Sequence, residues 1–432
     1  MENNNENKNL NYKPKLAIIG SGISGLVCAY FLKDKFDIKL FEKNNYFGGH
    51  SNTANIVYDD CKIAVDTGFI VFNYETYPNL TKFFDLLKVE VKKSQMSFAV
   101  KIDNGKLEYA GTSLFSMFAQ QKNIFNHHFW QMIFDILKFN KQAVELLKKP
   151  FDPSYSLKKF IDDLKMKSYF QKYYLLPMAS AIWSSPLAKI GDYPAQSFVQ
   201  FFKNHGLLTV NNQPQWYTVN NGSQSYVAKI IEQISNKVSL NDEVIKISND
   251  QNNKVLVKSA KTNEVFDKVI IASHSDQALK ILANPNKLHQ EILGNIKYQE
   301  NLAVLHKDQK IMPNSKKAWA SWVYSSQGQD HDKLSVSYWM NNLQGIDNKY
   351  PLFVTLNPNQ EIAKQDIFGQ YKYHHPIFDE KTIIAQQRFD EIQGLNNLYF
   401  CGAYRYFGFH EDGFNSALQV INKLEVKLPW QV

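Results

Sequence analysis

Three glycines near the amino terminus have the spacing of a phosphate-binding turn. In the segment LAIIGSGISG, Gly20, Gly22 and Gly25 follow four apolar residues, 16–19. An apolar run this short and ended by glycine is typical of a buried parallel strand. We expect Gly20 to form a tight turn, Gly22 to let a pyrophosphate approach the backbone, and Gly25 to let the next helix pack closely on the strand.

The elements after this turn supply the remaining groups of a dinucleotide site. The helix would begin at Ile23 and Ser24, whose amides lie at the positive end of its dipole. A second strand, DIKLF, is followed by Glu42 and Lys43, and Glu42 lies 22 positions after Gly20 (42 − 20). An acid at this distance accepts the ribose hydroxyls of adenosine and repels a 2′-phosphate, which disfavours NADP. The alternative is a strand, turn and helix that bind nothing.

A second glycine pair narrows the choice of dinucleotide. Gly48-Gly49-His50 comes directly after the second strand, and VDTGFIVF begins at Val65. A NAD site of the simple dehydrogenase type does not need this pair. The sequence therefore favours a different dinucleotide.

The composition indicates a globular protein with two domains or one elaborated one. The chain has 432 residues, of which 44% are hydrophobic and 21% charged. The first residues, MENNNENKNLNY, predict a disordered tail. We find no signal peptide and no run of 18 apolar residues, and therefore expect a cytoplasmic protein.

The charge distribution bears on the partner. The net charge of +8 is spread along the chain and accompanies no zinc-finger, homeodomain or RNP pattern, so we expect no nucleic acid partner. An acidic metabolite or an anionic membrane surface fits better. The aromatic content of 14% fits a wide apolar cavity as well as ordinary core packing.

Cysteines and histidines do not suggest a metal. Cys28, Cys61 and Cys401 have no CxxC spacing, and we expect them to be reduced packing residues. The pairs His127-His128 and His374-His375 are adjacent and lack the i, i+4 spacing that places two ligands on one helix face. We therefore expect no metal site.

The segment from Tyr77 to about residue 206 has a helical pattern. Within it, Phe129, Ile133, Ile136 and Leu137 recur at helical spacing beside several lysines. Two interpretations of the basic aromatic stretch 115–139 stay open. It is either a helix that covers a substrate cavity, the commoner case, or a helix that lies on a membrane interface.

The remaining motifs predict that a first domain is assembled from three stretches. NDEVIKIS, KVLVKS and FDKVIIAS read as strands that return to the nucleotide-binding part, and NNLYFCGAYRYFGFHEDGFNSALQVINKL reads as strand, loop and helix. Residues 14–76, 207–285 and 390–432 would form this domain. Residues 77–206 and 286–389 would form a substrate domain, helical in part and with a Trp- and Tyr-rich antiparallel sheet.

The order and extent of these motifs resemble the flavin-containing amine oxidase and carotenoid desaturase superfamily. The closest branch is that of the bacterial predicted NAD/FAD-binding, FAD-dependent amine-oxidase-like proteins found beside cyclopropane-fatty-acid synthase. Motifs that carry the resemblance, from Lys15 to near Leu424, include GSGISGL, FEKNNYFGGHSNT, VDTGFIVFNYETYPNL, QPQWYTVNNGSQSYV and FCGAYRYFGFHEDG. The resemblance implies an α/β fold: a three-layer, Rossmann-like FAD-binding domain with a parallel sheet and a second α+β substrate domain, in the two-domain architecture of amine oxidases.

The resemblance also implies a cofactor-binding set. The first glycines would lie at the pyrophosphate, Glu42 at the adenosine ribose, and Gly49 and His50 at the phosphates. Gly68 and Phe69 would border the isoalloxazine ring. The complete set is Gly20, Gly22, Ile23, Ser24, Gly25, Glu42, Lys43, Gly49, His50, Gly68, Phe69, Val244, Gly402, Asp412, Gly413 and Phe414.

The later members of this set have separate roles. Val244 would meet the adenine through its backbone. The ribityl and pyrimidine end would be held, through amides at a helix start, by Gly402, Asp412, Gly413 and Phe414. Many relatives have Arg in place of His50, and the usual Ser-Gly reads Ser416-Ala417 here. The earlier motif with a flavin-tethering cysteine is missing, so FAD should be bound non-covalently.

Candidates for catalysis lie beside the last motif. His410 and Glu411 are the best-placed bases for removing a proton while a flavin accepts hydride, and Tyr406 is a third candidate. The alternative role for His410 and Glu411 is to form hydrogen bonds with the backbone of the loop. Residues that would line the cavity or pack in the core are Trp183, Trp216, Trp319, Trp322 and Trp339.

These observations favour an FAD-dependent oxidoreductase that dehydrogenates an apolar, lipid- or fatty-acyl-derived substrate. One alternative is a flavin amine oxidase that produces hydrogen peroxide. The other is a non-catalytic flavoprotein that presents membrane lipid to a lipid methyltransferase, with the basic aromatic stretch as a peripheral contact at the inner face of the membrane.

Overall fold

The computed structural model describes residues 13–183, 190–204, 206–208, 213–327 and 335–430. The disordered tail was expected over residues 1–13, and residues 1–12 of it lie outside the described residues. The chain divides into two compact units. Unit 1 comprises residues 1–49, 227–294 and 388–432, and unit 2 comprises residues 50–226 and 295–387. The chain first passes from unit 1 to unit 2 between Gly49 and His50, earlier than residue 76, where the sequence placed this boundary.

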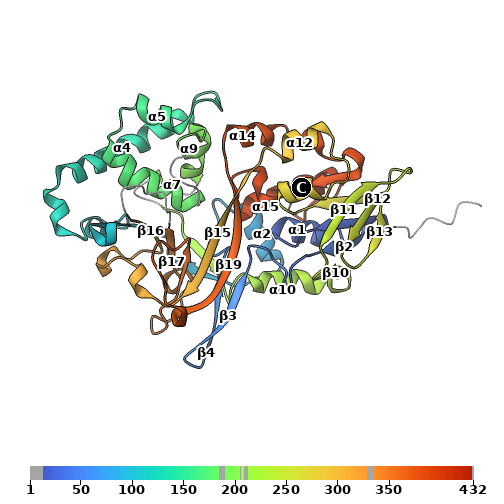
Figure 1. Ribbon diagram of the computed structural model, residues 1–432, viewed down its shortest axis with the longest axis horizontal. Helices are drawn as coiled ribbons and strands as arrows, with labels where there is room; N and C mark the ends of the chain where they lie inside the picture. Colours follow the sequence, from blue (N-terminus) through green and yellow to red (C-terminus); the bar gives the residue numbers. More distant parts are fainter. Residues whose placement is uncertain (1–12, 184–189, 205, 209–212, 328–334, 431–432) are drawn as a thin grey trace, which may run out of the picture. The chain divides into compact units, whose positions relative to one another are not determined.

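A five-stranded parallel sheet lies at the centre of unit 1 (Figure 1). Its order is β10-β2-β1-β14-β20, and each neighbouring pair is parallel. Leu16, Ala17 and Ile18 are fully buried, which explains the continuous apolar run of β1. The parallel sheet expected from the sequence is confirmed. Its strands are β1 (Lys15–Ile19), β2 (Asp37–Phe41), β10 (Val238–Ser239), β14 (Lys268–Ile271) and β20 (Leu398–Phe400).

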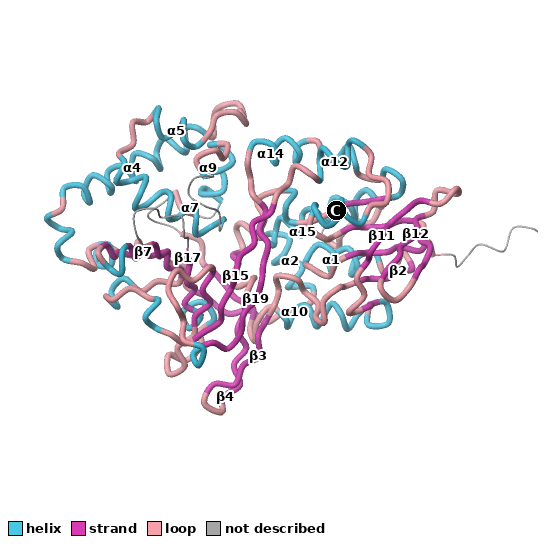
Figure 2. Tube along the Cα trace, viewed as in Figure 1, coloured by secondary structure: helices cyan, strands magenta, loops and turns pink. Residues whose placement is uncertain are grey.

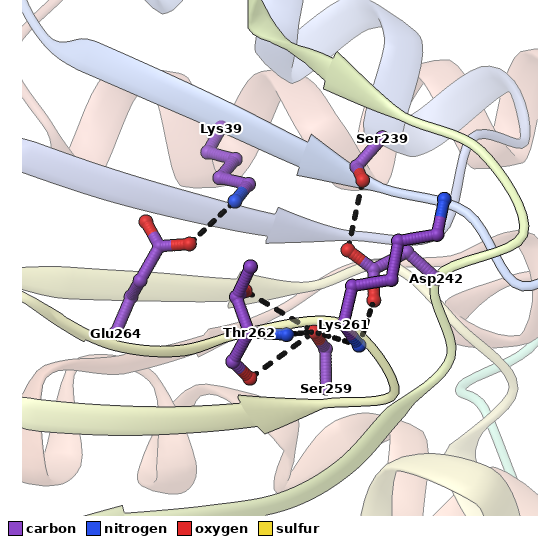
Figure 3. A network of polar contacts seen from close by, with 7 residues as sticks. All are labelled: Lys39, Ser239, Asp242, Ser259, Lys261, Thr262 and Glu264. Carbon is purple, nitrogen blue, oxygen red and sulfur yellow. Dashed lines mark hydrogen bonds and ion pairs between the residues drawn. The ribbon is translucent and has the colours of Figure 1, made fainter.

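A three-stranded antiparallel sheet covers one face of this parallel sheet. It consists of β11 (Val244–Asn249), β12 (Val255–Ser259) and β13 (Asn263–Phe266). Lys39 and Phe41 lie on the same face of β2, because alternate residues of a strand do. Lys39 Nζ forms an ion pair with Glu264 Oε1 at 2.5 Å, drawn in Figure 3, and the ring of Phe41 lies 6.1 Å from that of Phe266.

Helices of unit 1 complete the nucleotide-binding part. Helix α1 packs against β1, β2 and α15, although α1 and α15 are far apart in the sequence. Both bring their amino-terminal ends to the region of the glycine turn, as the contacts below show. The helices are α1 (Ile23–Leu32), α11 (Ser275–Ile281), α12 (Lys287–Leu293) and α15 (His410–Lys423), and α10 (Gln224–Gln233) crosses from unit 2 into unit 1.

A seven-stranded mixed sheet forms the frame of unit 2, with the long pair β15 and β19 prominent in Figure 2. Its order is β19-β15-β18-β17-β16-β7-β8. The expected antiparallel strands are present as β16, β17 and β18, with Trp and Tyr in β16 and β17. The sheet is not wholly antiparallel as expected, because β16 pairs in parallel with β7. The strands are β7 (Phe98–Ile102), β8 (Leu107–Ala110), β15 (Tyr298–His306), β16 (Trp322–Ser326), β17 (Ser335–Trp339), β18 (Phe353–Leu356) and β19 (Ile367–Pro376).

The rest of unit 2 consists of two small sheets and a group of helices. β3 (Thr53–Tyr58) pairs with β4 (Cys61–Asp66), and β9 (Trp216–Val219) pairs with β5 (Phe72–Asn73) and β6 (Val91–Ser94). The helices are α2 (Pro78–Leu86), α3 (Leu114–Met117), α4 (His127–Leu146), α5 (Leu157–Asp163), α6 (Ser168–Phe170), α7 (Leu176–Trp183), α9 (Ala195–Asn204), α13 (Met340–Gln344) and α14 (Glu380–Gln387).

The helical pattern from Tyr77 to about residue 206 was only partly right. Strands β6, β7 and β8 occupy most of residues 91–110 inside it. Each has only four or five residues, and each is fixed by pairing with a distant or neighbouring strand: β6 with β9, and β7 with β16 and β8. Periodicity within so short a run does not distinguish a strand from a helix.

Candidate cofactor-binding site

The glycine turn has the geometry that the sequence predicts. Gly20 has φ of +99° and donates its amide to Phe41 O at 2.8 Å, which ties the turn to the end of β2. A Cβ on Gly25 would lie 1.9 Å from Gly20 O, so only glycine permits this approach of α1 to the turn. Gly22 differs from Gly25. A Cβ built on Gly22 would meet no described atom within 4 Å, its neighbours along the chain set aside. Gly22 faces open space at the start of α1, where a ligand has room to approach.

The second glycine pair lies against the first. Gly49 has φ of +59°, and a Cβ on it would come within 3.2 Å of Gly22 Cα. Gly48 donates its amide to Ser21 O at 3.0 Å and approaches Ser21 Oγ at 3.3 Å. The two glycine segments therefore form one backbone surface without side chains, beside the amino-terminal end of α1. Such a surface suits a phosphate group.

Glu42 is buried and already accepts three hydrogen bonds. Its Oε2 accepts from Ser21 N at 3.0 Å and Ser21 Oγ at 2.6 Å, and its Oε1 accepts from Asn44 N at 2.9 Å. Because a carboxylate has about four acceptor positions, one is left for a ribose hydroxyl, and a second hydroxyl would compete with Ser21. The adjacent Lys43 has an exposed side chain.

Val244 lies at the start of β11, close to Glu42. Asp242 N donates to Glu42 O at 2.9 Å, which fixes the chain two residues before Val244 beside the end of β2. Asp242 is held in turn by Ser239 Oγ at 2.8 Å and by Lys261 N at 3.1 Å (Figure 3). Burial raises the pKa of Asp242, but hydrogen bonds from Ser259, Ser239 and Lys261 outweigh it and lower the pKa.

The amino-terminal ends of α1 and α15 meet. Ser24 Oγ donates to Gly413 O at 2.8 Å. A Cβ on Gly413 would lie 2.7 Å from Ile23 Cγ2, so glycine is needed for this approach. Gly402 N donates to Ser416 Oγ at 3.0 Å, which fixes the loop after β20 on α15. The structure thus brings Ile23, Ser24, Gly402 and Gly413 together from the two ends of the chain.

Asp412 and Phe414 take mainly structural positions in α15. Asp412 Oδ2 accepts Phe409 N at 2.9 Å and so caps its own helix. Burial, with the neighbouring Glu411 charge, raises the pKa of Asp412 to about 7, although backbone hydrogen bonds from the preceding loop oppose the rise. The Phe414 side chain is fully buried in unit 1, where it contributes to the packing of α15.

The three catalytic candidates lie near the start of α15. His410 and Glu411 are buried in its first turn. The Tyr406 hydroxyl accepts a hydrogen bond from Nε2 of Gln419, which lies further along α15. Burial raises the pKa of Tyr406. Gln419 is therefore a structural partner of Tyr406. The roles of His410 and Glu411 stay predictions from the sequence.

Arg405 is a feature that the sequence analysis did not single out. Its guanidinium is buried, donates to Asp390 Oδ1 at 2.9 Å and stacks over the Phe389 ring at 4.9 Å. It holds the loop between β20 and α15 to the preceding segment of unit 1. The only signal in the sequence was a charged residue within FCGAYRYFGFHEDG, and its long-range partner was not predictable from spacing.

In unit 2, His50 lies in a cluster of rings. Its ring centroid lies 4.8 Å from that of Tyr373 and 5.5 Å from that of His375. Burial lowers the pKa of His50 to about 4, with a contribution from His374. Burial likewise lowers the pKa of His375 to about 3, with contributions from His50 and His374. At neutral pH both rings are uncharged, so His50 carries no positive charge.

Gly68 and Phe69 are fixed against the His50 backbone. A Cβ on Gly68 would lie 2.3 Å from His50 O, and Phe69 N donates to His50 O at 2.7 Å. Asp66, at the end of β4, anchors this segment because Oδ1 accepts from Ser223 N at 2.8 Å. Burial raises the pKa of Asp66 to about 6, although hydrogen bonds from Thr53 and Ser223 oppose the rise. Sequence reasoning missed Asp66, which was visible only as a polar residue at a strand end.

The candidate tryptophans serve mainly as packing residues. Trp319 and Trp339 form an edge-to-face pair at 5.2 Å against a buried cluster around Val323 and Phe353. Trp216 is buried in β9, Trp322 packs on Tyr338 at 5.0 Å, and the Trp183 side chain is outside the described residues. No cavity lined by these residues is needed to explain their positions.

The cysteines and acidic or imidazole groups are dispersed. Cys28 and Cys401 are buried and Cys61 is half-buried, and all three are free thiols. Burial, with Cys401 nearby, raises the pKa of the Cys28 thiol well above its usual value. Among the residues that the structure describes, no three His, Cys, Asp or Glu side chains are grouped to hold a metal ion.

Comparison with known proteins supports the fold assignment. A family model described as an NAD(P)-binding Rossmann-like domain matches residues 18–87. The glycine fingerprint of such a domain is shared by NAD and FAD sites. No curated protein sequence matches this chain significantly.

Solved structures resemble nearly the whole chain. A CLA-producing fatty acid isomerase from P. acnes has a TM-score of 0.70 at 13% identity, over 96% of this chain and 99% of its own. Cyclohexylamine oxidase from Brevibacterium oxydans IH-35A has a TM-score of 0.68 at 12% identity, over 96% and 100%. Putrescine oxidase bound to putrescine has a TM-score of 0.67 at 13% identity, over 96% and 99%. The chain therefore has the amine-oxidase-like α/β fold that the sequence motifs implied.

Proposed function

We propose that the protein is an FAD-dependent oxidoreductase that binds its cofactor non-covalently. The observation that carries this proposal is the contact between Gly22 and Gly49, made beside the first turn of α1 and next to the buried Glu42. A second glycine segment at the pyrophosphate position is not needed in a simple NAD site. Its close contact with the first turn supports the larger cofactor.

The residues of unit 1 fit the nucleotide half of FAD. Gly22 and Gly49 would leave room for the pyrophosphate, and the amides of Ile23 and Ser24 would donate to it. Glu42 would accept one ribose hydroxyl, and the Val244 backbone would meet the adenine. A 2′-phosphate would meet the buried Glu42 charge, which disfavours NADP. His50, Gly68 and Phe69 in unit 2 remain predictions from the family resemblance.

We further propose an apolar, lipid-derived substrate. When bound, the flavin accepts the hydride of a C–H bond, and the protein must orient that bond and hold or move the accompanying proton. The fatty acid isomerase among the structural neighbours supports a fatty acyl chain. So does the sequence resemblance to proteins found beside cyclopropane-fatty-acid synthase.

An unactivated acyl chain requires a base as well as the flavin. We assign this role to Glu411 or His410, since both are buried in the first turn of α15. A buried base is protected from competing proton exchange with water. The Tyr406 hydroxyl, which contacts Gln419, would act only in shaping the loop.

A flavin amine oxidase that forms hydrogen peroxide is the second candidate. The putrescine and cyclohexylamine oxidases among the structural neighbours favour it. For an amine, the nitrogen lone pair assists hydride loss, so no base is required. A non-catalytic flavoprotein that serves a lipid methyltransferase is the third candidate, and it predicts flavin binding without substrate-driven reduction.

Anaerobic reduction of the flavin separates these candidates. The purified, FAD-loaded protein is mixed in parallel with phospholipids carrying modified acyl chains and with a panel of amines, and the flavin absorption is followed. Bleaching by the acyl lipid supports the main proposal. Bleaching by amines alone, with peroxide formed in air, assigns an amine oxidase, and no bleaching by either class supports the accessory role.

A further inference from the structure

Helix α4 of unit 2 carries a second apolar face that points to solvent. Positions 130, 134, 137, 141 and 144 are spaced by four and three residues and therefore lie on one side of the helix. Three of them are Trp130, Phe134 and Leu137, with exposed fractions of 40%, 65% and 51%. We call this side the outer stripe. It also carries Lys141 and Val144.

The outer stripe is not needed for packing. The opposite side of α4 is buried through Phe129, Met132, Ile136 and Phe139, and the helix packs there against α6 and α9. The sequence had placed Leu137 on the same face as Phe129 and Ile136, which was wrong. Periodicity could not separate the two faces, because both sides of the helix are apolar.

The apolar surface continues into the segment before α4. Trp130 Nε1 donates to Ile124 O at 2.9 Å, and its ring lies 5.1 Å from that of Phe118. Next to them, Phe125 is 89% exposed, and Phe115 is 66% exposed. Within 35 positions, this part of the chain exposes an unusual number of large apolar side chains. On the surface of a soluble protein, exposed apolar residues are normally single and scattered.

Lysines border this apolar surface. Residues 113–149 contain five lysines, at 122, 138, 141, 148 and 149, against two acids, Asp135 and Glu145. Asp135 is buried, while all five lysines are exposed. A partner with its own positive surface would be repelled, whereas anionic headgroups would pair with the lysines as the aromatic rings enter the acyl boundary.

We propose that residues 113–149 form a docking surface for an anionic phospholipid bilayer. Helix α4 would lie in the plane of the interface, with Trp130, Phe134 and Leu137 in the headgroup and acyl boundary. Within the described residues, no helix is long and apolar enough to cross a bilayer, so the contact is peripheral. This inference is independent of the proposed redox activity.

Vesicle binding by the full-length protein tests the proposal. Sedimentation is measured with phosphatidylcholine vesicles and with the same vesicles containing phosphatidylglycerol. The variant F125S/F134S removes two exposed rings of the surface, and V57S/I245S is the matched control because Val57 and Ile245 are also exposed, at 62% and 53%, but lie elsewhere. Circular dichroism establishes that each variant is folded.

The expected result is binding to the anionic vesicles that falls about tenfold or more in F125S/F134S and is retained in V57S/I245S. K141E should weaken this binding, whereas K258E, at an exposed lysine of β12, should not. Binding of F125S/F134S and K141E equal to that of the unaltered protein would overturn the proposal. The absence of vesicle binding would also overturn it. If, in addition, ultracentrifugation showed a dimer that F125S/F134S abolishes, the surface would be assigned to contact with a second copy of the chain.

Discussion

Ser21 Oγ donates a hydrogen bond of 2.6 Å to Glu42 Oε2, while Ser21 O accepts the amide of Gly48 at 3.0 Å. One residue of the glycine turn thereby fixes both Glu42, the acid proposed to bind the ribose, and the second glycine pair. Because Glu42 is buried, its carboxylate depends on these donors to offset its lost hydration. The ribose and pyrophosphate positions of the proposed site are therefore set by a single local network.

Substitution Glu42→Gln tests this network. The amide keeps the shape of the side chain but places a donor where Ser21 N or Asn44 N now donates. We expect FAD affinity to fall about tenfold or more and the melting temperature to drop, because charged hydrogen bonds contribute about 1.5–3 kcal/mol each. Fluorescence titration of the refolded apoprotein with FAD measures the affinity. Glu243→Gln, at an exposed acid of the same segment, should change neither quantity, and unchanged affinity in Glu42→Gln would remove Glu42 from the site.

Gly22→Ala and Gly25→Ala should have opposite phenotypes. A methyl group at Gly25 would overlap Gly20 O, so we expect a loss of stability of about 3 kcal/mol or more. A methyl group at Gly22 meets open space, so the fold should persist while FAD affinity falls about tenfold. Thermal unfolding and FAD titration separate the two effects. Gly111→Ala, also in open space, is the control and should keep both properties. Unimpaired FAD binding by Gly22→Ala would place the pyrophosphate elsewhere.

The cluster of His50 and His375 predicts a pH dependence of stability. Their folded pKa values, about 4 and about 3, lie below the ordinary value of 6.5, so the unfolded chain binds more protons as the pH falls below about 6.5. Their contribution to stability is therefore lost between about pH 6.5 and about pH 3. The raised pKa values of Asp66 and Asp412 act in the opposite direction, so the informative quantity is a difference between proteins.

His375→Gln supplies that difference. Between pH 7 and pH 5, the variant should lose about 1–2 kcal/mol less stability than the unaltered protein. Urea unfolding at both pH values measures it. His127→Gln removes an exposed histidine and should lose as much stability between pH 7 and pH 5 as the unaltered protein. If His375→Gln and the unaltered protein lost equal stability between pH 7 and pH 5, His375 would not be a group that loses a proton on folding.

Glu411→Gln and Tyr406→Phe test the proposed base. If Glu411 removes the substrate proton, Glu411→Gln should slow flavin reduction about 10²-fold or more at unchanged FAD affinity. Tyr406→Phe should stay within about twofold, because it loses a contact with Gln419 that shapes the loop. Stopped-flow absorption measures both rates. If Glu411→Gln reduces the flavin normally, the same experiment with His410→Asn decides between the two candidates.

The sequence was most informative where a contact depends on the backbone within a few residues. The roles of Gly20 and Gly25 follow from local steric limits, and the structure has both as predicted. The parallel sheet and the Trp-rich strands were also predictable, because their apolar patterns are strong. The match of residues 18–87 to a Rossmann-like domain reflects this local information.

Contacts between distant residues could not be predicted in this way. His50 and His375 lie 325 positions apart (375 − 50), and no spacing rule indicates that their rings adjoin. Ser21 reads as a filler between two glycines, yet it occupies much of the acceptor capacity of Glu42. The outward position of Leu137 depended on which apolar face of α4 the neighbouring helices cover, and that is decided by tertiary packing.

Binding of FAD tests the central claim most directly. The full-length protein is purified, its visible spectrum is recorded, and the protein is then precipitated with acid. We predict a yellow protein with one FAD per chain, whose flavin stays in the supernatant after precipitation. A colourless protein that takes up no FAD on incubation would contradict the account, and flavin retained in the acid precipitate would contradict non-covalent binding.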